Sequence, residues 1–351
     1  MLNEREIEKY LACVREIAKS HPIIDAHVHP FEVMYGGMRY FPNLIQPGVY
    51  SAGSLSYTPP VRGQWDPPKK QQNTPNCDCR IQSRVIALFL RKLYLHTGPK
   101  CLGDLMELAG ISKAILLPVF HTSEENEYQM CLLKEIFGGD HRFAIGYCVP
   151  NFVETERICS FIKEALEIYG IKILKIHPNI SRIDPRSVQG RKRFEAILMA
   201  SRKHCLKVII HGGISPLLEC PERNYGTIHN LKEIDFGITD QPVILSHACT
   251  FGCNTGEVKE LLPLMKKLLS RYANLMVDIS ATEFEALCLI LKNIDHARIV
   301  FGSDALYELQ WKTVVKLLHG IKLTHKNYQE IFIKIASTNP LRLFQKEFGY
   351  G

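Results

Sequence analysis

Residues 22–29 read Pro-Ile-Ile-Asp-Ala-His-Val-His, an aliphatic run that ends in two histidines two positions apart. Seven further runs rich in aliphatic and β-branched residues follow: KAILLPV (113–119), RFAIGYCV (142–149), IKILKIH (171–177), LKVIIH (206–211), PVILSH (242–247), NLMVDIS (274–280) and ARIVFGS (297–303). Most of these runs are continuously apolar rather than alternating, which is typical of parallel strands buried on both faces. We therefore predict eight parallel strands.

Longer segments with helical periodicity lie between the runs. They include TERICSFIKEALEIYG (155–170), GRKRFEAILMASRKH (190–204) and TGEVKELLPLMKKLLSRYA (255–273), with apolar residues spaced three and four apart. Eight alternating βα units predict the α/β class and a (β/α)8 barrel that spans residues 1–351 as a single domain. The last segment, 328–344, is predicted to be a helix that stops near Asn339–Pro340, because proline disfavours helix at the residue before it.

One connection is far longer than a βα unit requires. Residues 31–105 are rich in Pro, Gly, Tyr and Asn and end in an apolar helical patch at 80–96. Because this insertion leaves the first strand at its C-terminal end, we expect a lid over the barrel mouth; the alternative is a disordered loop. Substrate contacts are expected from its aromatic and guanidinium side chains, unless the aromatics only anchor the lid and the arginines are solvated: Tyr35, Arg39, Arg62 and Trp65.

Composition excludes several classes of protein. The 351 residues are 46% hydrophobic and 23% charged, values of an ordinary globular chain, and the net charge of +7 is spread rather than gathered into a basic block. We expect no nucleic-acid partner. No secretory signal and no apolar run of about 18 residues is visible, which predicts a soluble, cytoplasmic protein without a membrane partner.

The twelve cysteines follow no dense framework, so they are expected to be mostly reduced thiols. Cys77 and Cys79, and Cys249 and Cys253, lack the paired spacing of zinc ribbons. Packing is the simpler account of Cys249 and Cys253, although both follow the sixth predicted strand and could line a pocket.

Polar residues stand at the C-terminal ends of several predicted strands. The first strand ends in His27 and His29, which period-two alternation places on one face. The others are Lys175 and His177 on the fourth strand, His211 on the fifth, His247 on the sixth and Asp304 after the eighth. In a barrel these ends converge on one mouth. His27, His29, His211 and Asp304 form a set of three nitrogens and one carboxylate, which suits zinc and also accommodates manganese or iron.

These segments resemble the amidohydrolase superfamily, specifically its amidohydrolase-related branch of barrel hydrolases and decarboxylases. The matching stretches are I-I-D-A-H-V-H-P, I-L-K-I-H-P, V-I-I-H-G-G, V-I-L-S-H, I-V-F-G-S-D and N-P-L-R-L-F, in the family's order. The resemblance covers the first strand and the chain from about residue 110, but not the insertion. The branch includes aminocarboxymuconate-semialdehyde decarboxylase, in whose relatives such insertions help to build the substrate site.

The resemblance implies roles for individual residues. His27, His29, His211 and Asp304 would bind one divalent metal, most simply zinc, and His247 would act as a general acid/base or electrostatic stabiliser. Lys175 stands where some relatives carry a carboxylated lysine that bridges two metals, but it could equally hold a substrate carboxylate as a plain ammonium. His177 could be structural. Relatives often pair through outer helices, which implies a homodimer.

A cation held by three imidazoles and one carboxylate would lower the pKa of a bound water and polarise a carbonyl group. Asp304 could orient that water and take its proton, while His247 protonates the leaving group. The sequence thus predicts a metal-dependent hydrolase of a small, anionic carbonyl compound of the amide or lactone type. Two alternatives stay open: a non-oxidative decarboxylase of an aromatic or muconate-type acid, and a catalytically silent barrel with a binding role.

Overall fold

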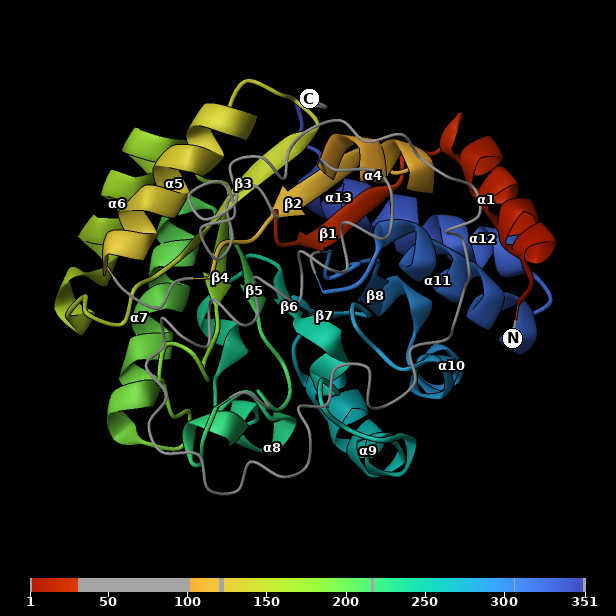
Figure 1. Cartoon of the computed structure of the whole chain (residues 1–351). Coiled ribbons are helices and arrows are strands. Elements are labelled where there is room, and N and C mark those ends of the chain that lie inside the picture. Colours follow the sequence, from red (N-terminus) through yellow and green to blue (C-terminus); the bar gives the residue numbers. More distant parts are fainter. Residues whose placement is uncertain (1, 31–101, 120–122, 216–217, 306, 350–351) are drawn as a thin grey trace.

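The structure is a computed structural model that describes residues 2–30, 102–119, 123–215, 218–305 and 307–349. Eight strands form its centre, and helices surround them, with α5, α6 and α7 on one side and α1, α11 and α12 on the other (Figure 1). The strands are β1 (Ile24–Val28), β2 (Lys113–Leu116), β3 (Phe143–Cys148), β4 (Ile173–Ile176), β5 (Lys207–Ile210), β6 (Val243–Leu245), β7 (Leu275–Asp278) and β8 (Ile299–Val300). Each lies within a predicted run and is shorter than it.

Most helices occupy the segments between these strands, whereas α1 precedes β1 and α11, α12 and α13 follow β8. The helices are α1 (Glu4–Ala18), α4 (Leu102–Ala109), α5 (Ser123–Phe137), α6 (Ile158–Tyr169), α7 (Val188–His204), α8 (Ile228–Leu231), α9 (Thr255–Arg271), α10 (Phe284–Asn293), α11 (Gln310–Thr324), α12 (Tyr328–Ile333) and α13 (Asn339–Phe344). Local sequence sets several of their ends. A reciprocal capping box between Asn254 and Glu257 begins α9, and α6 ends at Gly170, whose φ of 65° suits glycine.

The strands are parallel and follow one another around the sheet in the order β1 to β8. Backbone hydrogen bonds join the last strand region to the first: Asp304 N–H donates to His27 O at 2.9 Å, and His29 N–H donates to Ala305 O at 2.8 Å. The predicted (β/α)8 barrel is therefore confirmed, and its closure brings the segment after β8 against the end of β1.

Two apolar layers hold the barrel together. One lies between the sheet and the helices, where one face of each strand packs on the apolar side of the helices. The other fills the barrel interior with a residue from every strand: Ile24, Ile115, Ala144, Ile173, Ile209, Ile244, Met276 and Val300. Because each strand buries both faces, the continuous apolar runs in the sequence have a direct structural cause.

The C-terminal segment closes the end of the barrel where the strands begin. Phe344 and Phe348 belong to the interior apolar cluster, and the ring of Phe348 lies under the Nζ atom of Lys113, the first residue of β2. Glu347 forms an ion pair with Lys207, the first residue of β5. The strand ends that carry the polar residues are therefore at the opposite, C-terminal end of the barrel.

The predicted helix stop at Asn339–Pro340 is wrong. The chain continues from α12 through a π-helical turn (Lys334–Thr338) into α13, with Pro340 in the first turn of that helix. The proline follows the π-helical turn, where the carbonyl of Ile335 accepts from Phe301 N–H instead of from an N–H of the next turn. The Asn339 side chain donates to the carbonyls of His296 and Ile299, each at 2.7 Å, and ties this junction to the start of β8.

The proposed lid lies outside the described residues, apart from its last few positions, which belong to helix α4. Tyr35, Arg39, Arg62, Trp65, Cys77 and Cys79, and the helical patch at 80–96, also lie outside them. Among the helices that the structure describes, none combines the length and apolar character needed to cross a bilayer.

The closure of the barrel by Phe344 yields a stability prediction. Phe344 is fully buried, so Phe344→Ala should lower the free energy of unfolding by about 3–5 kcal/mol through lost burial and a cavity. Gln345→Ala, at the exposed next position, should change it by less than about 0.5 kcal/mol. Urea denaturation followed by circular dichroism measures both, and equal effects would contradict the assigned packing.

Candidate metal centre

His27 and His29 meet at the end of β1, although the strand is not regular there. The pairing of β1 with β2 shifts register between Asp25 and Val28, and Ala26 joins the interior cluster while Val28 joins the outer one. Simple alternation therefore does not explain the arrangement. The two rings nevertheless face each other, with their Nε2 atoms 3.1 Å apart.

Hydrogen bonds assign the tautomer of both rings. The Nδ1 atom of His27 lies 3.0 Å from the Oδ2 atom of Asp278, and the Nδ1 atom of His29 lies 2.5 Å from the carbonyl oxygen of Leu117. Both partners are acceptors, so each Nδ1 carries a proton and each Nε2 presents a lone pair. Burial, with the nearby charge of Lys175, lowers the pKa of His27 to about 3 and keeps its ring neutral.

Asp304 brings a carboxylate to the same point. Its Oδ1 atom lies 3.3 Å from His29 Nε2 and 3.5 Å from His27 Nε2. Burial raises the pKa of Asp304, whereas a hydrogen bond from His29 and charged imidazoles nearby lower it below its ordinary value. With the Nε2 atoms of His27 and His29 unprotonated, a bound cation would have to supply that stabilisation of the ionised carboxylate. Asp304 lies beyond β8 in a left-handed conformation, with a φ of 62°, and its N–H donates to His27 O.

His211 follows β5 directly, and His247 lies in a turn at the end of β6. The Nδ1 atom of His247 is 2.9 Å from Ser280 Oγ and 3.1 Å from Ser280 O, and its Nε2 atom is 3.2 Å from His211 Nδ1. Because the Ser280 carbonyl can only accept, His247 carries its proton on Nδ1 and accepts one from His211 Nδ1–H. His211 is then left with an unprotonated Nε2, a buried atom that has no hydrogen-bond partner.

Burial also governs the other titratable groups here. It lowers the pKa of His211 and of His247, so both rings are neutral. Lys175, on β4, is 1% exposed, and burial lowers the pKa of its amine to about 8. Its Nζ atom lies 3.2 Å from His27 Nε2 and 3.5 Å from Ser246 Oγ.

His177 lies beside this cluster. Its ring stacks on His211 with centroids 4.0 Å apart and an interplanar angle of 9°, and its Nδ1 atom accepts from Ile180 N–H at 3.4 Å. These contacts place the His177 ring against that of His211; whether His177 has a structural or a direct role stays a prediction.

Two groups of candidate ligand atoms occur among the described residues, each with all atoms within 4.8 Å of one another. One is His27, His29 and Asp304, and the other is His27, His247 and Asp278. His211 belongs to neither group, so three of the four expected ligands converge directly. The Nε2 atoms of His27, His29 and His211 are unprotonated, and Asp304 supplies a carboxylate. Such nitrogen and oxygen donors are the ligands that a zinc-type cation prefers.

Asp278 was not singled out from the sequence. It ends β7, and the same rule that selected the other strand-end residues applies to it within NLMVDIS. Of the two cysteines after the sixth strand, Cys249 is buried in the turn that holds His247, and burial raises the pKa of its thiol. Neither Cys249 nor Cys253 belongs to a group of candidate ligand atoms in the described part of the chain.

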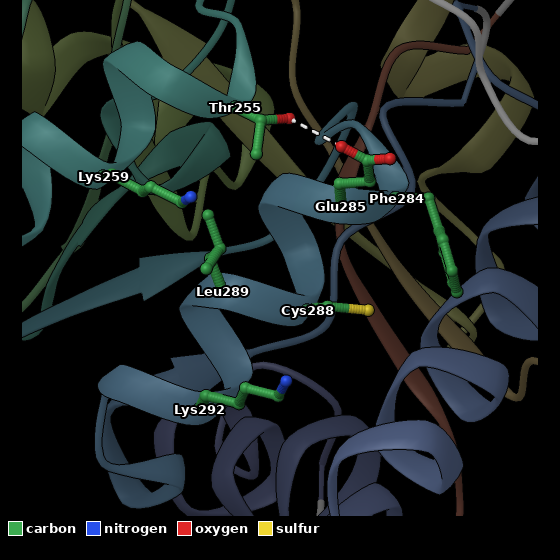
Figure 2. A pocket seen from close by; sticks show the side chains of 7 residues that line it. All are labelled: Thr255, Lys259, Phe284, Glu285, Cys288, Leu289 and Lys292. Atoms are coloured by element: carbon green, nitrogen blue, oxygen red, sulfur yellow. Dashed lines mark hydrogen bonds between the residues drawn. The ribbon is translucent and has the colours of Figure 1, made fainter.

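A surface pocket lies away from this centre. Figure 2 shows it between α9 and α10, lined by Thr255, Lys259, Phe284, Glu285, Cys288, Leu289 and Lys292. It shares no residue with the centre, so the chemistry of the histidines does not extend to it.

The tight approach of β8 to His27 yields a prediction. A Cβ atom at Gly302 would lie 2.8 Å from His27 Cβ, so Gly302→Ala should cost about 1–3 kcal/mol of stability by overpacking. At Gly320, inside α11, a Cβ would meet only side-chain atoms at 3.5–3.7 Å, so Gly320→Ala should be neutral or stabilise by about 0.5–1 kcal/mol. Thermal melts of the two variants decide this, and a stable Gly302→Ala protein would refute the close contact.

Comparison with known proteins shows the fold. No model of a protein family matches the sequence, and no curated protein sequence matches it. Solved structures of similar fold include a 5-carboxyvanillate decarboxylase from Sphingomonas paucimobilis, with a TM-score of 0.57 and 12% identity over 93% of this chain and 99% of that one. A 2,6-dihydroxybenzoate decarboxylase solved with 2,6-dihydroxybenzoate has a TM-score of 0.52 and 14% identity over 73% of this chain and 92% of that one. An amidohydrolase from Burkholderia multivorans with bound zinc has a TM-score of 0.53 and 10% identity over 92% of this chain and 99% of that one. The chain shares the barrel fold of these enzymes.

Proposed function

We propose that the protein is a divalent-metal-dependent hydrolase of a small, anionic carbonyl compound, related to the amidohydrolase superfamily. One observation carries this proposal: His27 Nε2 and His29 Nε2 face each other at 3.1 Å with Asp304 Oδ1 3.3–3.5 Å away. Two lone pairs and a carboxylate oxygen repel one another at such distances unless a proton or a cation lies between them. The strand-end motifs follow one another along the chain in the order typical of the amidohydrolase superfamily, which supports the proposed relationship.

The residues fit a metal ion. Zinc is bound in proteins by neutral imidazole nitrogens and carboxylate oxygens, and catalytic sites commonly use three protein ligands and leave one position open. His27, His29 and Asp304 supply such a set. The unpaired Nε2 atom of the buried His211 is a further donor, because nothing else in the described structure satisfies it.

The protein's own groups suit hydrolysis. When bound, a divalent cation lowers the pKa of a coordinated water and polarises a carbonyl group. Asp304 is ionised and can accept a proton from the attacking water. The proton that Asp304 accepts can then be returned to the leaving group, either directly or through the unprotonated Nε2 atom of His247 once that atom parts from His211. His29 and His27, fixed by their Nδ1 contacts, would hold the geometry during these transfers.

Decarboxylation is the second candidate, and the Lys175 amine favours it. With a pKa of about 8 this group is an ammonium at neutral pH, and its hydrogen-bond contacts are a ring nitrogen and a hydroxyl, not a carboxylate. An ammonium in this position suits a substrate carboxylate. Two of the structures with similar folds are decarboxylases of aromatic acids.

Metal content tests the site directly. Protein purified without added metal or chelator should contain about one zinc, manganese or iron per chain by elemental analysis. His211→Ala should lose most of this metal while the barrel stays folded, because it removes an imidazole whose Nε2 is free to coordinate.

His319→Ala is the matched control. This histidine is on α11, where it hydrogen-bonds to Tyr10 and stacks on Phe284, so its loss should leave metal content unchanged. Metal-free protein that binds none of these cations on titration would refute the proposal, whereas about two metals per chain would point to carboxylation of Lys175.

Product analysis separates the two reactions. Zinc-loaded protein should hydrolyse a member of a panel of lactones and amides that carry a carboxylate, and Asp304→Asn should lower kcat by about 100-fold or more because the proton acceptor is lost. Release of carbon dioxide from hydroxybenzoates or muconate-type acids, without hydrolysis of the panel, would favour the decarboxylase instead.

A further inference from the structure

Asp278 is a fully buried carboxylate at the end of β7 that accepts hydrogen bonds on both oxygens. Its Oδ2 atom is 3.0 Å from His27 Nδ1. Its Oδ1 atom accepts from His247 N–H at 2.9 Å, from Ser280 N–H at 3.0 Å and from the Ser280 hydroxyl. These four polar contacts hold the carboxyl group of Asp278 in one place inside the barrel.

The contact with His27 determines which nitrogen of that ring is available. A carboxylate on Nδ1 holds the proton there and leaves Nε2 unprotonated, and it also makes the ring a stronger donor. In addition, the contact sets the plane of the ring, so that Nε2 points toward His29 and Asp304.

The contact with His247 acts on the backbone. His247, Ala248 and Cys249 have φ values of 57°, 46° and 56°, a run of left-handed residues that is costly for side chains other than glycine. Asp278 accepts the N–H of the first of these residues and so anchors the turn. Because His247 Nε2 in turn accepts from His211 Nδ1, the anchored turn also orients the His211 ring.

We infer that Asp278 is the positioning residue of the metal centre: it selects the Nε2 tautomer of His27 and, through the His247 turn, aligns His211, without itself binding the ion. The inference rests on the proposed metal site. The competing role is that of a ligand, since Asp278 also groups with His27 and His247.

The geometry argues against a ligand role. The Oδ1 atom already accepts from three donors, and N–H or O–H groups that point at an oxygen also repel a cation beside it. An ion at Oδ2 would have to displace the proton on His27 Nδ1, which the carboxylate itself stabilises.

The substitution Asp278→Asn tests the inference with little change of shape. The amide oxygen can still accept from His247 and Ser280, but an amide NH2 group directed at His27 Nδ1 favours the opposite tautomer, with the proton on Nε2. We expect Zn²⁺ affinity, measured by competition with a chromophoric chelator, to fall about 10- to 100-fold, with the circular dichroism spectrum retained.

A second measurement needs no metal, and its first part needs no variant. Nitrogen-15 NMR of the metal-free wild-type protein should show His27 protonated on Nδ1, and the Asp278→Asn protein should show it protonated on Nε2. Asp25→Asn is the matched control: Asp25 is a fully buried carboxyl nearby that contacts Ser303, Gln310 and the backbone of His27, but no imidazole ring. This variant should leave the His27 tautomer unchanged.

The outcomes separate the two proposals. Unchanged Zn²⁺ affinity in Asp278→Asn, or a wild-type His27 protonated on Nε2, would overturn the positioning role while the metal site stands. A drop from two bound metals to one would make Asp278 a ligand and also overturn it. Wild-type protein that binds no metal at all would overturn the proposed function, and the inference with it.

Discussion

The opposition of two imidazole lone pairs, His27 Nε2 and His29 Nε2 at 3.1 Å, is the interaction on which the centre depends. This arrangement depends on a hydrogen bond at the Nδ1 atom of each ring. His27 donates to the carboxylate of Asp278, the last residue of β7, and His29 donates to the carbonyl of Leu117, which follows β2. Those two acceptors lie on opposite sides of β1 around the barrel wall. The eight-stranded closure is therefore a requirement of the chemistry, since an open sheet would not bring β7 and β2 to the same pair of rings.

The mouth of the barrel also concentrates backbone strain. Left-handed residues other than glycine follow three consecutive strands: His247, Ala248 and Cys249 after β6, Ala281 after β7 and Asp304 after β8. Each such residue costs about 1–3 kcal/mol, and the surrounding structure must hold it in place. The buried apolar layers on both faces of the sheet supply that rigidity. Stability is thus provided by the strands, whereas the turns beyond them are free to present polar groups at angles that regular structure does not allow.

Much of this arrangement could be predicted from sequence, and the rest could not for identifiable reasons. The apolar runs located all eight strands because residues buried on both faces are apolar throughout. Of the four ligands predicted from the strand ends, His27, His29 and Asp304 converge directly, and His211 joins neither group of candidate ligand atoms. Asp278 was missed because its value lies in a hydrogen bond to a residue 251 positions away, which only the closed barrel reveals. Two further features were not predicted because tertiary contacts outweigh the local pattern. The irregular end of β1 involves the contact of His29 with Leu117, and the helix that continues through Pro340 involves the contact of Asn339 with His296.

The charges around His27 restrict what the centre can accept. Asp278 and Asp304 are ionised and Lys175 is an ammonium at neutral pH, so the three charged groups that contact this ring leave one net negative charge in a buried space. A divalent cation compensates that charge but meets the Lys175 ammonium, which already donates toward His27 Nε2 at 3.2 Å. The two cannot share one lone pair. Burial lowers the pKa of Lys175 to about 8, so loss of its proton costs little near neutral pH. In the proposed enzyme, Lys175 would therefore give up either its proton or its contact with His27 when a cation binds there.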